Sequence, residues 1–293
     1  GFRGWGSDFS IVKLNTAGNA VIYKATIGND ISAFDALHLA GGPSGQVALT
    51  GAVGSRNFTL GNAVQPIHGG GGYDAFALLL NATGDQLVFS TYLGGSAVDV
   101  GHGVAISADG NIRVVGRTLS PNFPTAMALQ PTLAGPADGF VTSLSPAGAL
   151  LQSTFLGGSG TDTVMGVGLG PLGVMHVAGK TDSPDFPLQD AIDTSRHSAF
   201  VTPLAPDGRS LLYSTYFGGT GEDSVSAVAA DTRNNTYIAG STTSGDFPLR
   251  LPIHVYAGGG DGFVAKFGPR GGLLHSTYLG CTGGDQIHGL AVD

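Results

Sequence analysis

Two short runs of glycine and acidic residues in this sequence have a composition that could bind calcium. GGSGTD (157–162) and GGTGED (218–223) match the start of a calcium-binding nonapeptide, in which backbone carbonyls and Asp oxygens ligate the ion. Such nonapeptides follow one another directly, so that adjacent turns share each ion, whereas these runs start 61 residues apart. The simpler interpretation is that four equivalent aspartates accept backbone N–H bonds in turns, and calcium is the alternative. These aspartates are Asp99, Asp162, Asp223 and Asp285.

The histidines offer a second set of candidate ligands. The eight His residues include no H-E-x-x-H motif or other close pair of ligands, so the sequence does not predict a zinc site. His102 and His288 each follow a turn aspartate by three residues, so we expect both at equivalent places near the axis of a repeating structure. The sister positions are Met165 and Ser226, which are poor members of a metal ring. A structural role in an inner strand is therefore favoured, with ligand binding as the alternative.

Nucleophilic catalysis has little support in the sequence. HGGG (68–71) is typical of the oxyanion-hole loop of some esterases, but the chain contains no G-x-S-x-G nucleophile elbow. We therefore interpret HGGG as a linker between strands, predict no catalytic residue and expect that the protein is not an enzyme. The single Cys281 excludes an intramolecular disulfide, and we interpret it as a small turn residue that replaces a Gly of its sister repeats.

The elements that must position these residues are repeated along the chain. LVFSTYLGGSAVD (87–99) has close relatives at 150–162, 211–223 and 273–285. A second motif places a phenylalanine at equivalent positions, with spacings of 67, 64, 60 and 63 residues. These phenylalanines are Phe9, Phe76, Phe140, Phe200 and Phe263. Approximate repeat units are 8–73, 74–137, 138–198, 199–260 and a partial unit 261–293.

Each unit contains four short apolar runs of strand length, separated by Gly, Asn, Asp or Pro, and no run has a helical period. In 87–93, Val88, Ser90 and Tyr92 share one face and Phe89 lies on the other. The sister positions of Tyr92 are all aromatic, while those of Phe89 vary, so we expect one packed face and one that tolerates variety. A unit of four strands cannot bury both faces of its sheet alone, which predicts an all-β fold of stacked four-stranded blades, a β-propeller.

Several linked motifs resemble a known family. STYLGG is followed by AISADGNIRVVG or AVAADTRNNTYIAG and then by NFP or DFP, at 122–124, 185–187 and 246–248. This series resembles the bacterial beta-propeller repeat called SBBP, and its inner strand pair is similar to that of NHL-type blades. The resemblance covers nearly the whole chain and implies the fold, but it implies no specific activity, because members are mostly exported or cell-surface proteins of undefined biochemistry.

In that register, inner strands are centred near Leu37, Val104, Val167, Val228 and Leu290, which predicts a single propeller domain over 1–293 with at least five blades. Two outer strands at the start and the inner strand IHGLAVD (287–293) would together form the fifth blade. The count is then 19 strands where five blades need 20. Three explanations stay open: the sequence is a fragment of a five-, six- or seven-bladed ring, the fifth blade has three strands, or a neighbouring chain donates a strand.

The composition points to function in outline. The net charge is −8, and the 13 Lys and Arg are scattered, which disfavours nucleic acid and acidic lipid as partners. No apolar run is long enough for a membrane helix, and no signal peptide is present. The low charged content of 12% suits an extracellular protein. Long divergent loops at 120–137, 182–198 and 243–260 are the expected recognition surface.

We therefore expect a non-catalytic extracellular or cell-surface scaffold or adhesive module without a cofactor. Its expected partners are protein or glycan, with self-association through open blade edges. The alternatives are a propeller lyase or glycosidase with carboxylates at the axis, and a calcium-stabilised surface protein.

Overall fold

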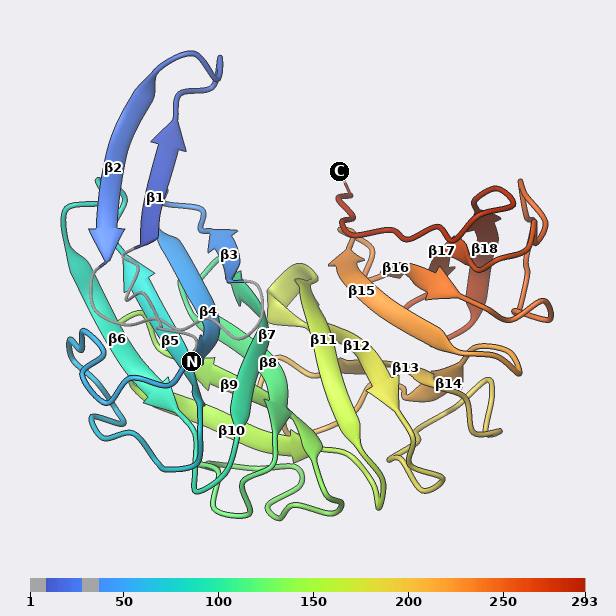
Figure 1. Ribbon diagram of the computed structural model, residues 1–293, viewed down its shortest axis with the longest axis horizontal. Helices are drawn as coiled ribbons and strands as arrows, with labels where there is room; N and C mark the ends of the chain where they lie inside the picture. The colour runs from blue at the N-terminus through green and yellow to red at the C-terminus, as the bar shows by residue number, and fades with distance from the viewer. Residues whose placement is uncertain (1–8, 28–36, 293) are drawn as a thin grey trace, which may run out of the picture. The chain divides into compact units, whose positions relative to one another are not determined.

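The computed structural model of the chain describes residues 9–27 and 37–292 (Figure 1). The described residues form 18 strands and one short 3₁₀ turn, Pro171–Gly173, so the all-β prediction is confirmed. The strands are β1 Phe9–Leu14, β2 Val21–Ile27, β3 His38–Gly41, β4 Val47–Val53, β5 Asp74–Leu80, β6 Leu87–Leu93, β7 Asp99–Ile106, β8 Ile112–Thr118, β9 Asp138–Leu144, β10 Leu150–Leu156, β11 Asp162–Leu169, β12 Met175–Thr181, β13 Ala199–Leu204, β14 Thr215–Phe217, β15 Asp223–Ala230, β16 Thr236–Thr242, β17 Asp261–Phe267 and β18 Leu273–Leu279.

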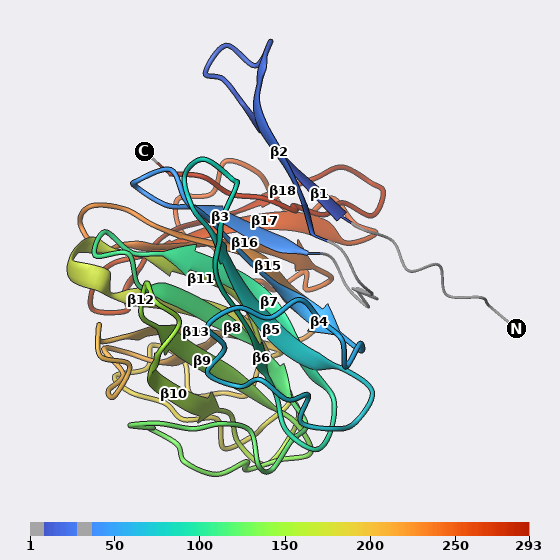
Figure 2. The same ribbon diagram turned by 90° about the vertical axis from the view of Figure 1, so that its left-hand side faces the viewer.

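The strands form four sheets of four strands each, in which strand order follows the sequence: β3–β6, β7–β10, β11–β14 and β15–β18. Neighbouring strands within β3–β6, β11–β14 and β15–β18 pair in antiparallel orientation. Four-stranded antiparallel sheets of this kind are the blades of a propeller fold. The remaining strands β1 and β2 form a two-stranded hairpin (Figures 1 and 2).

Each four-stranded sheet is offset by two strands from the repeat units of the sequence. The sheet β7–β10 takes β7 and β8 from the unit 74–137 and β9 and β10 from the unit 138–198. The turns that carry Asp99, Asp162 and Asp223 therefore connect the last strand of one sheet to the first strand of the next, and the turn of Asp285 follows the last strand of the sheet β15–β18.

The prediction of a last inner strand near Leu290 is wrong, because residues 286–292 form no strand. The inner strands β11 and β15 are held by ladders to β12 and β16, the strands that follow them. Among the described residues, no strand follows 286–292 to provide such a ladder. The expected strand near Leu37 begins at His38, and part of its surroundings lies outside the described residues.

The variable position of the fourth strand is buried in three of the four sheets, so the expectation of one tolerant face is wrong for those three. Phe89 and its sister residues Gln152 and Tyr213 are buried like Tyr92, whereas the remaining sister residue, His275 of β18, is half-buried. The reason is a contact that the repeat alone does not reveal. Gln152 lies against Gly208, a turn residue of the β13–β14 connection with φ 68°, and its Nε2 donates to the Gly208 carbonyl at 3.2 Å. A side chain at this glycine would collide with Gln152.

The long loops that follow the second strands run along the fourth strands. Ala126 forms a bridge to Ser153 of β10, Gln189 to Ser214 beside β14, and Arg250 to Ser276 of β18. Each loop thus covers backbone groups at the outer edge of a sheet, which otherwise would be free to pair with another chain. The loops are part of the sheet architecture as well as its surface.

The described chain divides into two compact units. Unit 1 comprises residues 1–114, 118–124 and 142–151, and unit 2 comprises 115–117, 125–141 and 152–293. Unit 1 contains a hydrophobic core with Phe76, Leu78 and Tyr92, and unit 2 contains two cores, one around Phe200 and Tyr216 and one around Phe263. The number of blades and the single-domain boundary stay predictions. Among the described residues, no helix has the length and apolar character needed to cross a bilayer.

Candidate functional site

The four turn aspartates all make the same local hydrogen bond. In each turn the residue four positions earlier donates its backbone N–H to Oδ2 of the aspartate, at 2.7 to 2.9 Å. The donors to Asp99, Asp162, Asp223 and Asp285 are Gly95, Gly158, Gly219 and Cys281. The turn interpretation of these aspartates is therefore confirmed, and Cys281 occupies a glycine position of its sister turns as predicted.

A second motif completes each turn. In TLSPNFP (118–124) the Ser120 hydroxyl donates to Asp99 Oδ2 at 2.9 Å and accepts the Ala97 N–H at 2.9 Å. Asn122 Oδ1 accepts the Ser96 N–H at 2.8 Å. The same bonds recur in TDSPDFP (181–187) and TTSGDFP (242–248), where Asp replaces Asn122.

The recurring aromatic residue of the fourth strand has a polar function in three of the four sheets. The Tyr216 hydroxyl donates to the Ser183 carbonyl at 2.6 Å and accepts the Phe186 N–H at 3.1 Å. Tyr92 and Tyr278 make equivalent bonds. Phe155 holds this place in β10 and has no hydroxyl to do so. In these three sheets, tyrosine thus ties the loop that follows the second strand to the fourth strand.

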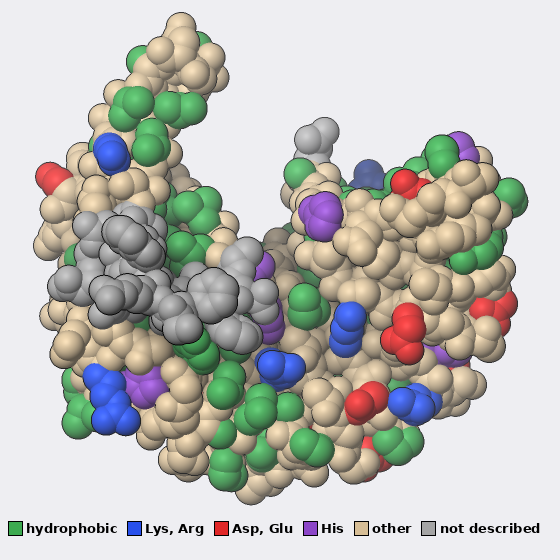
Figure 3. All heavy atoms as spheres, viewed as in Figure 1, with side chains coloured by type: hydrophobic (Ala, Val, Ile, Leu, Met, Phe, Trp, Pro, Cys, Tyr) green, Lys and Arg blue, Asp and Glu red, His purple; other side chains and the backbone are tan. Residues whose placement is uncertain are grey.

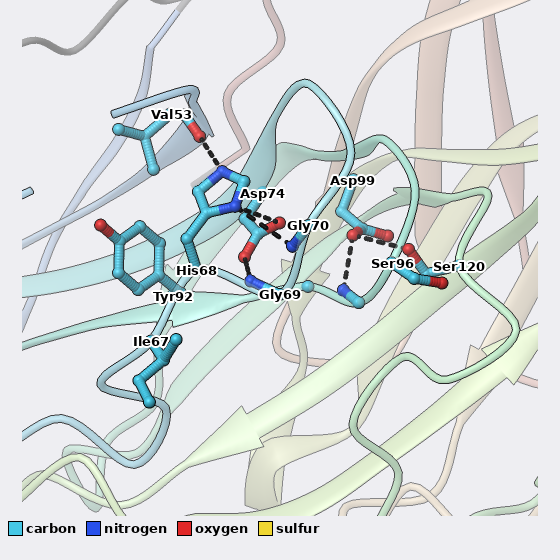
Figure 4. Close-up of polar contacts among 12 residues, drawn as sticks. Val53, Ile67, His68, Gly69, Gly70, Asp74, Tyr92, Ser96, Asp99 and Ser120 are labelled. Atoms are coloured by element: carbon cyan, nitrogen blue, oxygen red, sulfur yellow. Dashed lines mark hydrogen bonds and ion pairs between the residues drawn. The ribbon is translucent and has the colours of Figure 1, made fainter. Parts of the chain in front are cut away.

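A further carboxyl group, which the sequence analysis did not single out, lies beside Asp99. Asp74, at the start of β5, accepts the Gly69 N–H at 2.6 Å and is completely buried (Figure 4). Gly94 separates the two acids, since a Cβ built on it would lie 2.7 Å from both Asp74 Oδ1 and Asp99 Oδ2. Only glycine fits between them.

Burial raises the pKa of both acids of this pair. Loss of hydration raises the pKa of Asp74 to about 6, opposed by the bond from Gly69. Loss of hydration raises the pKa of Asp99 to about 6, opposed by bonds from Thr118, Gly95 and Ser120 and aided by the charge of Asp74. Among the residues that the structure describes, no Lys or Arg forms an ion pair with either carboxyl.

His68 contacts Asp74 but does not neutralise it. Its Nδ1 accepts the Gly70 N–H at 3.2 Å, and Nε2 lies 3.3 Å from the Val53 carbonyl, which requires a proton on Nε2 alone. Burial lowers the pKa of His68, so the imidazole is neutral and its 3.6 Å contact with Asp74 is not an ion pair. The N–H groups of Gly69 and Gly70 are both engaged inside the loop. The linker interpretation of HGGG therefore agrees with the structure.

The paired arrangement recurs, which indicates a structural role. Asp138 and Asp162 flank Gly157 in the same way, and Asp261 and Asp285 flank Gly280. All but Asp285 are buried. A sequence signal for the first acid of each pair did exist, because Asp74, Asp138 and Asp261 all precede the repeated phenylalanine of the third strand by two residues.

The same contacts bear on the calcium alternative. Calcium takes six to eight oxygen ligands, and N–H or O–H donors around a carboxylate oppose it. Oδ2 of Asp99, Asp162 and Asp223 already accepts such donors. Within residues 9–27 and 37–292, no group of three or more His, Cys, Asp or Glu is placed to hold a metal ion. These oxygens do not fit a calcium site.

The two candidate histidines differ in their surroundings. His102 lies in β7 of unit 1, where its ring is 6.4 Å from that of His38 in edge contact. His288 lies in unit 2, outside any strand, and is exposed. The sister residues Met165 and Ser226 sit at β-bulges of β11 and β15, where the register shifts. Sequence reasoning did not identify His38 as the neighbour of His102, because His38 belongs to the most divergent repeat.

A pocket of about 390 Å³ lies in unit 1 beside the Asp74–Asp99 pair. Its size is within the range of small-ligand sites. The lining comprises Val64, Gln65, Gly69, Leu93, Gly94, Gly95, Asn122, Pro124 and Leu150. None of these described lining residues has a charged or aromatic side chain. Gln65 is engaged with the backbone, since Nε2 donates to Ile67 and Gly94 and Oε1 accepts the Gly94 N–H.

Comparisons with known proteins agree with this architecture. Residues 88–124 and 212–248 match the family model described as "SBBP: Beta-propeller repeat". These segments contain the turn aspartate and the T-x-S-x-[ND]-F-P motif of two junctions. No curated protein matches the chain.

One similar solved structure is a crystal structure of a protein of unknown function from Bacteroides caccae at 1.35 Å resolution. It is 12% identical over 98% of this chain and 97% of that chain, with a TM-score of 0.39.

Proposed function

We propose that this chain, which belongs to the SBBP beta-propeller repeat family, is a non-catalytic binding module of an extracellular or cell-surface protein and recognises a polypeptide partner through the pocket. The observation that carries the proposal is the lining of the pocket. Val64, Leu93, Pro124 and Leu150 form aliphatic walls over a floor of glycine backbone. Such a pocket suits an aliphatic or proline side chain of a protein ligand.

The polar groups of the lining favour polypeptide over glycan. Each hydroxyl that a bound sugar buries needs a hydrogen-bond partner, or its desolvation remains uncompensated. The Gln65 amide is already engaged with the backbone, and Asn122 Oδ1 accepts bonds from Ser96. The Asn122 amide nitrogen is left as the side-chain donor of the lining, which suits one ligand carbonyl better than a ring of hydroxyls.

The structural role of the buried aspartates supports the proposal that the protein is not a catalyst. Asp74 and Asp99 are buried and hold turns, and equivalent pairs recur at other junctions. A catalytic pair needs contact with substrate, and the same local arrangement at several junctions is the pattern of a structural element. The surface agrees with a binding role outside the cytosol, since few Lys and Arg side chains lie on the face shown in Figure 3.

A binding screen with matched variants tests the proposal. Val64→Glu places a charge in the pocket, whereas Leu129→Glu makes the same change at the sister position of the next loop, which does not line the pocket. We expect peptides selected from a displayed library to bind the native protein and Leu129→Glu, and to lose affinity for Val64→Glu. Each protein is also applied to a glycan array.

Glycan binding that depends on Val64 would show that the pocket is the site but the ligand class is wrong. Peptide binding that is equal in both variants, or a library without any pocket-dependent peptide, would contradict the proposal. Asn122→Asp sharpens the result, because Asp stands at this position in the sister repeats and keeps the bond to Ser96 while it removes the amide donor.

A further inference from the structure

An exposed row of apolar residues lies in the loop 243–260, between β16 and β17 and beside β18. Leu249, Leu251, Ile253 and Val255 alternate with polar residues and proline, and we call them the apolar row. The exposed fractions of Leu251, Ile253 and Val255 are 74%, 69% and 75%. Hydrophobic side chains are visible on the surface of the β17–β18 region in Figure 3. Such a run of aliphatic side chains is costly in water unless another surface covers it.

The backbone at Leu251 adds an independent observation. Leu251 has φ 50°, a left-handed conformation that is strained for a bulky side chain. The left-handed bend recurs in the other three loops, where the residues are Asn62 and Asp190, which tolerate this conformation well, and Met127, which like Leu251 is bulky and exposed. Leucine here is strained and projects into solvent, so no packing within the described chain compensates for it. This combination points to a role outside the fold.

We infer that Leu251 and Ile253 of one copy of this chain insert into the pocket of a second copy. The inference rests on the proposed function, since it names a partner for the same pocket. The apolar row lies in unit 2 and the pocket in unit 1. A contact between two copies would therefore join two unlike surfaces, the row of one copy and the pocket of the other. Both are aliphatic, and the pocket has room for two aliphatic side chains.

Charge supports the same pairing. The exposed Arg250 and His254 lie between the residues of the apolar row, and the row contains no acid. The pocket floor at Gly94 adjoins Asp74 and Asp99, whose Oδ1 atoms have no hydrogen-bond partner within residues 9–27 and 37–292. An incoming segment that carries a guanidinium beside its apolar side chains would therefore meet negative potential at the pocket. Added salt should weaken this part of the attraction.

The size and symmetry of the contact define its expected behaviour. Stable complexes bury about 800 Å² on each partner, and a few aliphatic side chains provide much less, so the association should be weak and depend on concentration. A contact between two different surfaces is heterologous and leaves one free pocket and one free row at the ends of each assembly. We therefore expect chains of increasing length as the concentration rises, not a closed dimer.

Sedimentation velocity across a wide range of protein concentration tests the inference with the chain as it stands. Leu251→Asn introduces a residue that the sister bend of β4–β5 already uses, so folding should be retained. Met127→Asn is the matched control, since Met127 has φ 48° and is 59% exposed at the equivalent bend of another loop. Circular dichroism verifies that each variant is folded.

We expect the native protein and Met127→Asn to associate equally, and Leu251→Asn and Val64→Glu each to weaken association by about tenfold or more. An equimolar mixture of Leu251→Asn and Val64→Glu should restore dimers and nothing larger, because each complex then has only one intact pocket and one intact row that can meet. Native protein that stays monomeric at all concentrations, or equal effects of Leu251→Asn and Met127→Asn, would overturn the inference.

The same variants separate this inference from the proposed function. If Val64→Glu abolishes peptide binding while the native protein remains monomeric, the pocket is a recognition site for another polypeptide and only the second copy is wrong. If neither peptide binding nor association responds to Val64→Glu, both the pocket and its partner are wrong.

Discussion

Two turns that connect neighbouring sheets have the same geometry but different residues. They are the turn between β6 and β7 and the turn between β14 and β15. In the first, Asp74 and Asp99 flank Gly94, and the Asp99 N–H donates to the Tyr73 carbonyl at 2.9 Å. In the second, Ser198 stands at the position of Asp74, and its hydroxyl accepts the Asp223 N–H at 2.7 Å. The Asp223 carboxylate keeps the bonds from a backbone N–H and a serine that the carboxylates of Asp99 and Asp162 accept.

The difference separates the two acids by function. At the three junctions between sheets, the second acid accepts bonds from a backbone N–H, a serine and a threonine. The fourth turn retains the acid as Asp285, which accepts the Cys281 N–H. The first acid is replaceable, since Ser198 forms an equally closed turn. His197 accompanies this change, with contacts from Nδ1 to the Gly219 carbonyl and from Nε2 to Asp193.

The largest expected effect tests this division directly. Asp99→Ala leaves the Gly95 N–H and the Ser120 hydroxyl buried without an acceptor, which should lower the free energy of unfolding by about 3 kcal/mol. Asp74→Ser imitates the third junction and should cost about 1 kcal/mol or less. Urea denaturation at pH 7.5 measures both. Equal losses would show that the first acid is as important as the second.

The pH dependence of the same variant comes next. The pKa of Asp74 is about 6 in the folded chain, above its ordinary value of 3.8 in the unfolded chain, so folding takes up a proton between these values. The free energy of unfolding of the native chain should therefore rise relative to Asp74→Ser as the pH falls from 7.5 to 4, by roughly 2 kcal/mol.

His176 acts in the opposite direction, because burial lowers its pKa to about 4 and it resists protonation in the folded chain. Its contribution should be common to both proteins and so cancel in the comparison. A difference that stays constant with pH would contradict the raised pKa of Asp74.

A smaller effect is expected at the feature that the two junctions share. Tyr92→Phe and Tyr216→Phe each remove a hydroxyl that links a buried carbonyl to a buried N–H, and each should lower the free energy of unfolding by about 1 kcal/mol. Tyr256→Phe, which loses an exposed bond to the Thr243 carbonyl, is the control and should have less effect. Chemical denaturation measures all three. Unequal losses for Tyr92 and Tyr216 would mean that the junctions differ in more than the first acid.

The smallest expected effect concerns calcium. Because Oδ2 of Asp99 and of Asp223 already accepts hydrogen bonds, a chelator should change the melting temperature by no more than about 1 °C. Differential scanning calorimetry with and without chelator measures the shift. A fall of several degrees would instead direct attention to Oδ1 of Asp99 and of Asp162, which have no hydrogen-bond partner in the described part of the chain.

Much of the fold could be predicted because the same sequence motifs recur along the chain. Phe76, Phe140, Phe200 and Phe263 recur with the same turn residues, so all four third strands were predicted, and Asp99 and its sister residues were correctly placed in turns. The contacts between sheets were not predictable in this way. Gln152 is a polar residue at a variable position, and its burial depends on a turn glycine 56 residues later.

The errors have a common physical cause. A strand needs a partner as well as a pattern, so residues 286–292 fail to form one despite their match to β11 and β15. The pocket was missed for a similar reason, since Val64, Asn122 and Leu150 belong to three different segments. One polar lining residue, Asn122, stands where two later repeats have aspartate, but this difference in the sequence could not be interpreted without the neighbouring walls of the pocket.

The offset between repeat and sheet has a consequence for how such a gene can change. Each sheet takes two strands from one repeat unit and two from the next. Duplication or deletion of about one unit length of sequence therefore preserves the strand order wherever the duplicated or deleted segment begins. Proteins with this layout can grow or shrink by whole sheets without any copy having to start at a structural boundary.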